Sequence, residues 1–258
     1  IALIAKELRQ ARRPILLVGG GARGASNAVR DLSEYTRIPA VPTWNATDII
    51  TSDFPLYAGR VGTYGGPGRN FAVQNCDLLI AVGSRVSGRI TGGSPETFAR
   101  GARRVYVNVD SAALNPKWQE APGHLNVLCD AEVFAEVLLH HDLRNVGSAE
   151  WAARCLAWRD RYDIVPAWTT RDRAINPYAF IQELSAALGP TDIILSDCGG
   201  NAVVTYQALR TKWGQRVISS HGNSPMGFAL AASIGAAKAS GGHRNVVCLI
   251  GDGGFCVN

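Results

Sequence analysis

The chain has 258 residues, of which 47% are hydrophobic, so it has enough apolar material for about two domains of ordinary size. Its net charge of +5 is spread along the chain rather than gathered in one basic stretch, which argues against a nucleic-acid partner. No apolar run approaches the ~20 residues that a membrane span needs, so we expect no membrane partner and a cytoplasmic location.

The six cysteines show no Cys-x-x-Cys spacing, and most lie in apolar stretches, where cysteine acts as a small hydrophobic residue. We therefore expect neither disulfides nor a zinc site. The chain begins within a helical pattern, contains Met226 as its only methionine, and stops just after a Gly-Asp-Gly-Gly turn. We expect both ends to be internal to a longer protein.

The first half of the chain alternates short β-rich runs with helical patterns, which is typical of a parallel sheet covered by helices. The runs that predict buried strands are residues 15–18, 78–82 and 105–109. Ser26 and Asp130 are the predicted N-caps of two of the intervening helices. Residues 1–141 are therefore predicted to form a Rossmann-like domain.

The second half begins with a stretch, residues 142–175, that lacks strand patterns and is rich in Trp, Arg and Ala, which predicts a helical linker. Asn176 and Pro177 then predict the N-cap and first residue of a helix that Gly189 ends. The elements predicted after it are a strand at 193–196, a helix at 202–209, a strand at 217–219, a helix at 226–239 and a strand at 246–250. Residues 176–258 thus predict a second α/β domain with a parallel sheet, truncated at its end.

The strongest motif is the last one, where the predicted strand 246–250 runs directly into Gly251-Asp252-Gly253-Gly254. Open α/β sheets bind phosphates and their metals at the carboxyl ends of strands, and glycines let the backbone approach such a ligand. Asp252 is therefore a candidate metal ligand. The alternative is a plain glycine turn without a ligand.

Two further strands end in similar turns, Cys198-Gly199-Gly200-Asn201 and a loop that contains Ser224 and Met226. Three strand ends would then direct glycine-rich turns and helix N-termini to one edge of the sheet, which suits a diphosphate with a divalent cation. The candidate ligand-binding residues are Gly199, Gly200, Asn201, Ser224, Met226, Gly251, Asp252, Gly253 and Gly254. His221 could touch the same ligand or be structural.

These motifs resemble those of thiamine-diphosphate-dependent enzymes of the acetolactate synthase, pyruvate oxidase and benzaldehyde lyase group. Residues 251–258 are similar to the start of the family's diphosphate signature, whose Mg²⁺ ligands are the Asp and an Asn about 25 residues later. Residues 222–236 are similar to another family segment, in which Met226 matches the hydrophobic residue that bends the cofactor, although Ala231 replaces the usual Pro. The resemblance implies that thiamine diphosphate and Mg²⁺ bind to the second domain.

The first domain resembles the family's central domain at residues 13–21, 75–85 and 106–110. That domain holds FAD in the synthases, and Gly62, Thr63, Arg85 and Asp110 match FAD-contacting stretches; the alternative is a vestigial site. Residues 19–24 also fit Gly-x-Gly-x-x-Gly, but the run 40–44 lacks the acidic residue of the dinucleotide fingerprint, which disfavours a nicotinamide cofactor.

The resemblance implies that the complete protein decarboxylates a 2-keto acid and transfers the resulting acyl carbanion to an acceptor. In the family the activating Glu belongs to another domain, so we predict no catalytic residue within this chain and no activity of the chain alone. Active sites of the family form between chains, which implies a homodimer or homotetramer. Two alternatives are a FAD- or nicotinamide-nucleotide-binding oxidoreductase and a non-catalytic scaffold.

Overall fold

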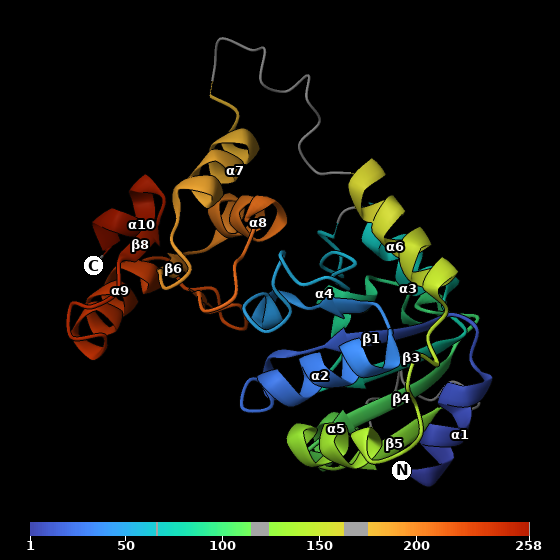
Figure 1. The fold of residues 1–258 in the computed structure, drawn as a ribbon. Helices are drawn as coiled ribbons and strands as arrows, with labels where there is room; N and C mark the ends of the chain where they lie inside the picture. Colours follow the sequence, from blue (N-terminus) through green and yellow to red (C-terminus); the bar gives the residue numbers. More distant parts are fainter. Residues whose placement is uncertain (66, 115–123, 163–174, 258) are drawn as a thin grey trace. The chain divides into compact units, whose positions relative to one another are not determined.

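The computed structural model describes residues 1–65, 67–114, 124–162 and 175–257, which form two compact units. The first unit comprises residues 1–50 and 54–162, and the second comprises residues 51–53 and 175–257 (Figure 1). Ser52 belongs to the second unit because its Oγ accepts a hydrogen bond from Thr211 N at 3.0 Å. None of the helices within these described ranges has the length and apolar character of a membrane span.

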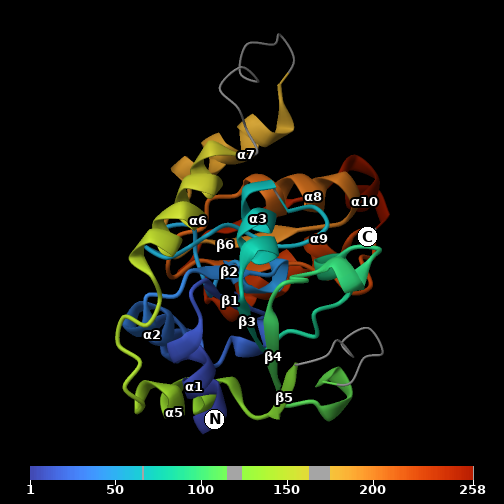
Figure 2. The same ribbon diagram turned by 90° about the vertical axis from the view of Figure 1, so that its right-hand side faces the viewer.

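A five-stranded parallel sheet in the order β2-β1-β3-β4-β5 forms the centre of the first unit, and Figure 2 shows the strands in this order. The strands are Pro14–Val18 (β1), Ala40–Pro42 (β2), Leu78–Val82 (β3), Arg103–Asn108 (β4) and Leu125–Leu128 (β5). Side chains alternate between the two faces, so Ile15 and Leu17 belong to one core and Leu16 and Val18 to the other. Burial on both faces explains why β1 and β3 are uninterrupted apolar runs.

Helices cover both faces of this sheet (Figure 1). Ala2–Gln10 (α1), Ser26–Thr36 (α2) and Ala131–Leu139 (α5) pack on one face, and Pro67–Asn75 (α3) and Ala149–Arg161 (α6) on the other. A short helix, Gly88–Thr91 (α4), and 3-10 turns at Gly20–Ala22, Trp44–Ala46, Pro95–Thr97 and Ser111–Leu114 lie in the connections. The prediction of an α/β fold is confirmed.

Of the two helix N-caps predicted in this unit, one is confirmed and the other is wrong. Asp130 is the N-cap of α5 as predicted, and its Oδ1 accepts a hydrogen bond from Glu132 N at 2.8 Å. The predicted N-cap Ser26 is wrong: the helix starts at Ser26 itself, after Ala25 as N-cap. A 3-10 turn ends at Ala22, shortly before α2, and the Ser26 hydroxyl donates backward to Arg23 O at 2.6 Å.

Helix α6 falls within residues 142–175, the predicted linker, yet it packs inside the first unit. Trp151 and Cys155 of α6 are buried in the same core as Ile15 and Leu17. Trp151 Nε1 also donates a hydrogen bond to Pro14 O at 3.0 Å. Residues 163–174 of the predicted linker lie outside the described residues.

The glycine run after β1 lies so close to the turn after β3 that the two backbones are in contact. A Cβ added to Gly19 would lie 2.3 Å from Gly83 O, and one added to Gly83 would lie 2.4 Å from Ala22 N. Gly83 also has a φ of +63°, which side-chain-bearing residues rarely adopt. The run that fits Gly-x-Gly-x-x-Gly thus brings two strand-end turns of the protein together.

We predict that Gly83→Ala lowers the free energy of unfolding by at least about 2 kcal/mol, because it combines a left-handed backbone with a backbone clash. Gly88→Ala is the matched control, since no described atom lies within 4 Å of a Cβ there. Denaturant unfolding measures both variants. Equal midpoints for the two would show that the turns can separate without cost.

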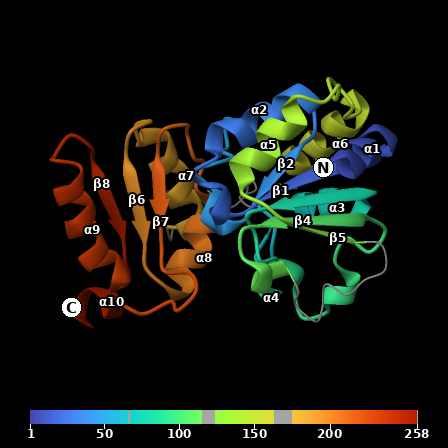
Figure 3. The same cartoon turned by 90° about the horizontal axis from the view of Figure 1, so that it is seen from below.

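The second unit contains a three-stranded parallel sheet in the order β7-β6-β8. Its strands are Ile193–Ser196 (β6), Arg216–Ile218 (β7) and Val246–Leu249 (β8), and its helices are Pro177–Ala187 (α7), Gly199–Ala208 (α8), Phe228–Ala239 (α9) and Asp252–Val257 (α10). Helix α9 covers one face, where Ala229 packs against Ile193 and Leu195, and α7 and α8 lie on the other (Figure 3).

The predicted elements of this unit are present, with shifted ends. Asn176 caps α7 as predicted, its Oδ1 accepting from Tyr178 N at 2.9 Å. Helix α8 begins at Gly199 instead of residue 202, because both glycines after Cys198 enter its first turn. Helix α9 begins at Phe228 instead of Met226, because Gly227 before it has a φ of +87°.

Candidate functional site

Three turns follow the carboxyl ends of β6, β7 and β8, and parallel pairing places these ends at one edge of the sheet (Figure 3). The turns are close to one another. A Cβ added to Gly253, after β8, would lie 3.0 Å from Met226 Cε in the loop after β7. The predicted convergence of these two segments is therefore seen in the structure.

Asp197, at the end of β6, joins these turns, and sequence analysis gave it no role. Its side chain is buried, with Oδ2 accepting from Gly227 N at 3.0 Å and Oδ1 from Ala229 N at 3.0 Å. These two N–H groups begin α9, so Asp197 caps that helix. The helix N-terminus after β7, which the sequence assigned to an anionic ligand, already holds a carboxylate of the protein.

The N-terminus of α8 is open to a ligand. No described atom lies within 4 Å of a Cβ added to Gly199 or Gly200, and both glycines are exposed. The side chain of the N-cap residue, Cys198, makes no capping hydrogen bond to α8. Asn201 is tied to the strand end, since its Oδ1 accepts from Ser196 Oγ at 3.0 Å. Exposed N–H groups and the helix dipole suit an anion here.

Asp252 lies at the surface as the first residue of α10, and its Oδ1 accepts from Gly253 N at 2.8 Å. Gly251 before it is also exposed, with no described atom within 4 Å of an added Cβ. Within the described part of the chain, no group of three or more His, Cys, Asp or Glu side chains could hold a metal. One carboxylate with phosphate oxygens and water suits Mg²⁺, which retains several non-protein ligands.

Met226 is 53% exposed, so most of its side chain is available to a ligand at this edge. Ser224 two residues earlier has a φ of +47° and donates its N–H to Ser220 O at 2.7 Å. His221 in the same loop packs edge-on against Tyr206 of α8, with ring centroids 4.3 Å apart. The loop that contains Ser224 and Met226 is thus held by the Ser224 hydrogen bond and by the contact between His221 and Tyr206, and it leaves Met226 exposed.

Three cysteines, Cys198 at the site and Cys76 and Cys155 in the first unit, have thiol pKa values raised above the ordinary value. Desolvation and then the neighbouring Asp197 carboxylate raise the pKa of Cys198 above its ordinary value of 9.0. Burial raises the pKa of both Cys76 and Cys155 in the first unit to about 12. Protonated thiols are weak nucleophiles, so these three cysteines do not supply covalent catalysis.

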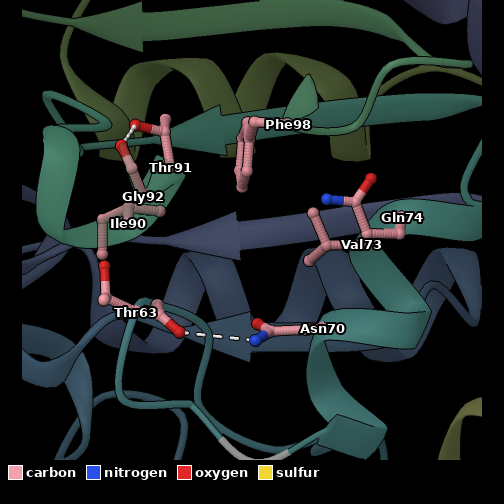
Figure 4. Close-up of a pocket in the computed structure, with 9 residues that line it drawn as sticks. Thr63, Asn70, Val73, Gln74, Ile90, Thr91, Gly92 and Phe98 are labelled. Atoms are coloured by element: carbon pink, nitrogen blue, oxygen red, sulfur yellow. Dashed lines mark hydrogen bonds between the residues drawn. The ribbon is translucent and has the colours of Figure 1, made fainter. Parts of the chain in front are cut away.

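The first unit contains a cavity of about 220 Å³ (Figure 4). It is lined by Gly62, Thr63, Asn70, Val73, Gln74, Ile90, Thr91, Gly92 and Phe98. Asn70 Nδ2 donates to Gly62 O at 3.4 Å, and Thr63 Oγ1 to Arg89 O at 3.1 Å. Small-molecule sites usually measure roughly 300–1,000 Å³, so this cavity is smaller than a whole flavin dinucleotide needs.

The four predicted FAD residues are only partly brought together. Gly62 and Thr63 line the cavity. Arg85 and Asp110 do not line it; they are exposed in the connections after β3 and β4. Asp110 Oδ1 accepts from Ala112 N at 2.9 Å and so takes part in its own turn.

Comparison with known proteins gives two family matches. Residues 1–138 match the "Thiamine pyrophosphate enzyme, central domain", and residues 197–258 match the "Thiamine pyrophosphate enzyme, C-terminal TPP binding domain". The chain is 34% identical over 260 residues to the acetolactate synthase isozyme 2 large subunit of Escherichia coli, aligning 97% of this chain and 44% of that protein. It is 32% identical over 270 residues to a probable acetolactate synthase large subunit of Methanocaldococcus jannaschii, aligning 98% of this chain and 44% of that protein. The chain thus spans less than half the length of these relatives.

Proposed function

Because this chain belongs to the acetolactate synthase-like family of thiamine pyrophosphate enzymes, we propose that the protein containing it decarboxylates a 2-keto acid and joins the resulting acyl carbanion to an acceptor. Bound thiamine diphosphate supplies a carbon nucleophile for the keto group and stabilises the carbanion left when CO₂ departs. The residues of this chain hold, orient and support that cofactor.

The observation that carries the proposal is the meeting of an exposed carboxylate, open glycine turns and a half-exposed methionine at one sheet edge. Asp252 would hold Mg²⁺, and the exposed N–H groups of Gly199 and Gly200 would bind diphosphate oxygens. Met226, whose Cε would lie 3.0 Å from a Cβ added to Gly253, would support the organic part of the cofactor. Each group has the chemistry that its part of the ligand requires.

The charges at the three turns favour binding of the diphosphate at two of them. The buried Asp197 carboxylate occupies the start of α9 and would repel a diphosphate there. The start of α8 has no such carboxylate cap and carries the positive end of the helix dipole. The diphosphate is therefore assigned to the turns after β6 and β8.

The experiment for this function is an assay of the intact protein with pyruvate, the simplest 2-keto acid. CO₂ release and a carbon–carbon ligation product are expected when thiamine diphosphate and Mg²⁺ are both present, and neither when one is omitted. Cofactor-independent turnover, or no turnover with any of a panel of 2-keto acids, would contradict the proposal.

FAD remains a proposed second ligand, supported by Gly62 and Thr63 on the cavity of the first unit. The volume of about 220 Å³ admits only one end of the molecule, so the rest would lie outside the cavity. Flavin absorbance in the purified intact protein tests this assignment. A colourless protein that does not take up added FAD would contradict it.

A homodimer or homotetramer in the cytoplasm is also part of the proposal. Its support is the family membership and the likeness to proteins named as acetolactate synthase large subunits, which belong to assemblies of more than one chain. The molar mass of the intact protein in solution tests the assembly, and a monomer that is fully active would contradict it.

A further inference from the structure

We propose that Asp197 is a positioning residue of the cofactor site: its carboxylate holds the loop that carries Met226 against the turn Gly251–Gly254. The inference deepens the proposed function, because it assumes that Met226 and Asp252 act on thiamine diphosphate. Asp197 is 3% exposed, so it acts through its neighbours and does not itself touch the ligand.

The carboxylate of Asp197 fixes the segment directly after Met226. Oδ2 accepts from Gly227 N at 3.0 Å and Oδ1 from Ala229 N at 3.0 Å, across 30 and 32 residues of chain. Gly227 has a φ of +87°, so it is where the loop turns into α9. A shift of these two hydrogen bonds would move Gly227 and, with it, Met226.

The same carboxylate contacts the turn that carries Asp252. A Cβ added to Gly254 would lie 2.5 Å from Asp197 Oδ2, so only glycine allows α10 to start against the carboxylate. The backbone of Asp197 is bonded to both neighbouring strand ends: its N–H donates to Leu249 O at 3.0 Å, and its carbonyl accepts from Ser219 Oγ at 3.1 Å. One residue thus contacts the segments after β6, β7 and β8.

The chain offers a matched control at the other end of the same strand. Asp192, just before β6, is also buried and accepts two hydrogen bonds, from Gly189 N to Oδ2 at 2.7 Å and from Asn245 Nδ2 to Oδ1 at 3.1 Å. It lies at the amino end of the sheet, away from the strand ends that carry the candidate site. Asp192→Asn and Asp197→Asn therefore remove comparable carboxylates from opposite ends of β6.

The experiment is calorimetric titration of the intact protein with thiamine diphosphate in saturating Mg²⁺, together with thermal unfolding of each variant. In Asp197→Asn the amide NH₂ would face a backbone N–H, and we expect cofactor affinity to fall at least about tenfold, as for one lost hydrogen bond to a charged group. Asp192→Asn is expected to lower the melting temperature similarly but to change the affinity less than about twofold.

A second measurement separates positioning from general destabilisation. Gly254→Ala is expected to weaken cofactor binding in the wild-type background, through its clash with Asp197, and to weaken it much less in an Asp197→Ala background. If Gly254→Ala weakens cofactor binding by the same factor in both backgrounds, the inference is overturned. If Asp197→Asn does not fold, Gly254→Ala alone decides, and unchanged affinity in that variant overturns the inference.

The outcomes distinguish this inference from the function on which it rests. Wild-type binding with unchanged affinity in Asp197→Asn, or equal losses in Asp197→Asn and Asp192→Asn, would overturn the positioning role alone. Absence of Mg²⁺-dependent binding in the wild-type protein would overturn both.

Discussion

Replacement of Asp252 by alanine is expected to abolish Mg²⁺-dependent binding of thiamine diphosphate. Asp252 is the carboxylate within the glycine turn after β8, and it is exposed to solvent at the start of α10. Mg²⁺ requires near-octahedral oxygen ligands, and a site with few protein ligands loses most of its affinity when one carboxylate is removed. Titration calorimetry of the intact wild-type and variant proteins, with and without Mg²⁺, measures the loss.

Asp130→Ala is the control for this variant. Asp130 is likewise an exposed carboxylate that accepts a backbone N–H at the start of a helix, but it lies in the first unit. Its loss should cost about 1 kcal/mol of stability through the missing cap and leave cofactor affinity unchanged. Equal affinities of wild type and Asp252→Ala would mean that Asp252 is only a turn residue.

Met226→Ala is expected to lower kcat at least about tenfold and to change cofactor affinity less than about threefold. The thioether has neither charge nor a strong hydrogen-bonding group, so it contributes little to holding a diphosphate. Its half-exposed side chain, with Cε near Gly253, can instead support one shape of the bound cofactor. Steady-state kinetics at saturating thiamine diphosphate separates the two parameters.

Met226→Leu is the control that keeps an apolar side chain of similar volume, and it should retain most of the turnover. The Asp197→Asn variant should show a different pattern, in which affinity falls as well, because the whole loop moves. A kcat of Met226→Ala equal to that of the wild type would remove the supporting role of Met226.

Local signals in the sequence predicted much of the fold. The buried strands β1 and β3 are continuous apolar runs, and Asp130 and Asn176 cap their helices through bonds that span only two or three residues. Strand β5 was missed because it is a half-exposed edge strand with alternating burial. Helix α3 was missed because it starts with Pro-Gly, which is typical of a turn.

The candidate site was predicted from its glycines and Asp252, whereas the role of Asp197 could not be. Its partners Gly227 and Ala229 lie 30 and 32 residues away, and only the sheet brings them together. The one local signal was an acidic residue between an apolar strand and a glycine turn. The same pattern at Asp252 leads to an exposed carboxylate, so the pattern alone does not distinguish a ligand for a metal from an internal cap.

Glycine runs have a similar ambiguity. Gly19 and Gly83 let two backbones of the first unit touch, while Gly199 and Gly251 leave open space at an exposed sheet edge. Sequence alone shows that a close approach is allowed, and the structure shows which neighbour makes it.

A crystal structure of the intact protein with Mg²⁺ and thiamine diphosphate tests most directly whether the turns after β6 and β8 hold the diphosphate. The expected result is Mg²⁺ about 2.1 Å from an Asp252 carboxylate oxygen, diphosphate oxygens within about 3 Å of N–H groups at the start of α8, and Asp197 still bonded to Gly227. A diphosphate at the start of α9 with Asp197 displaced, or a metal without Asp252 as a ligand, would contradict it.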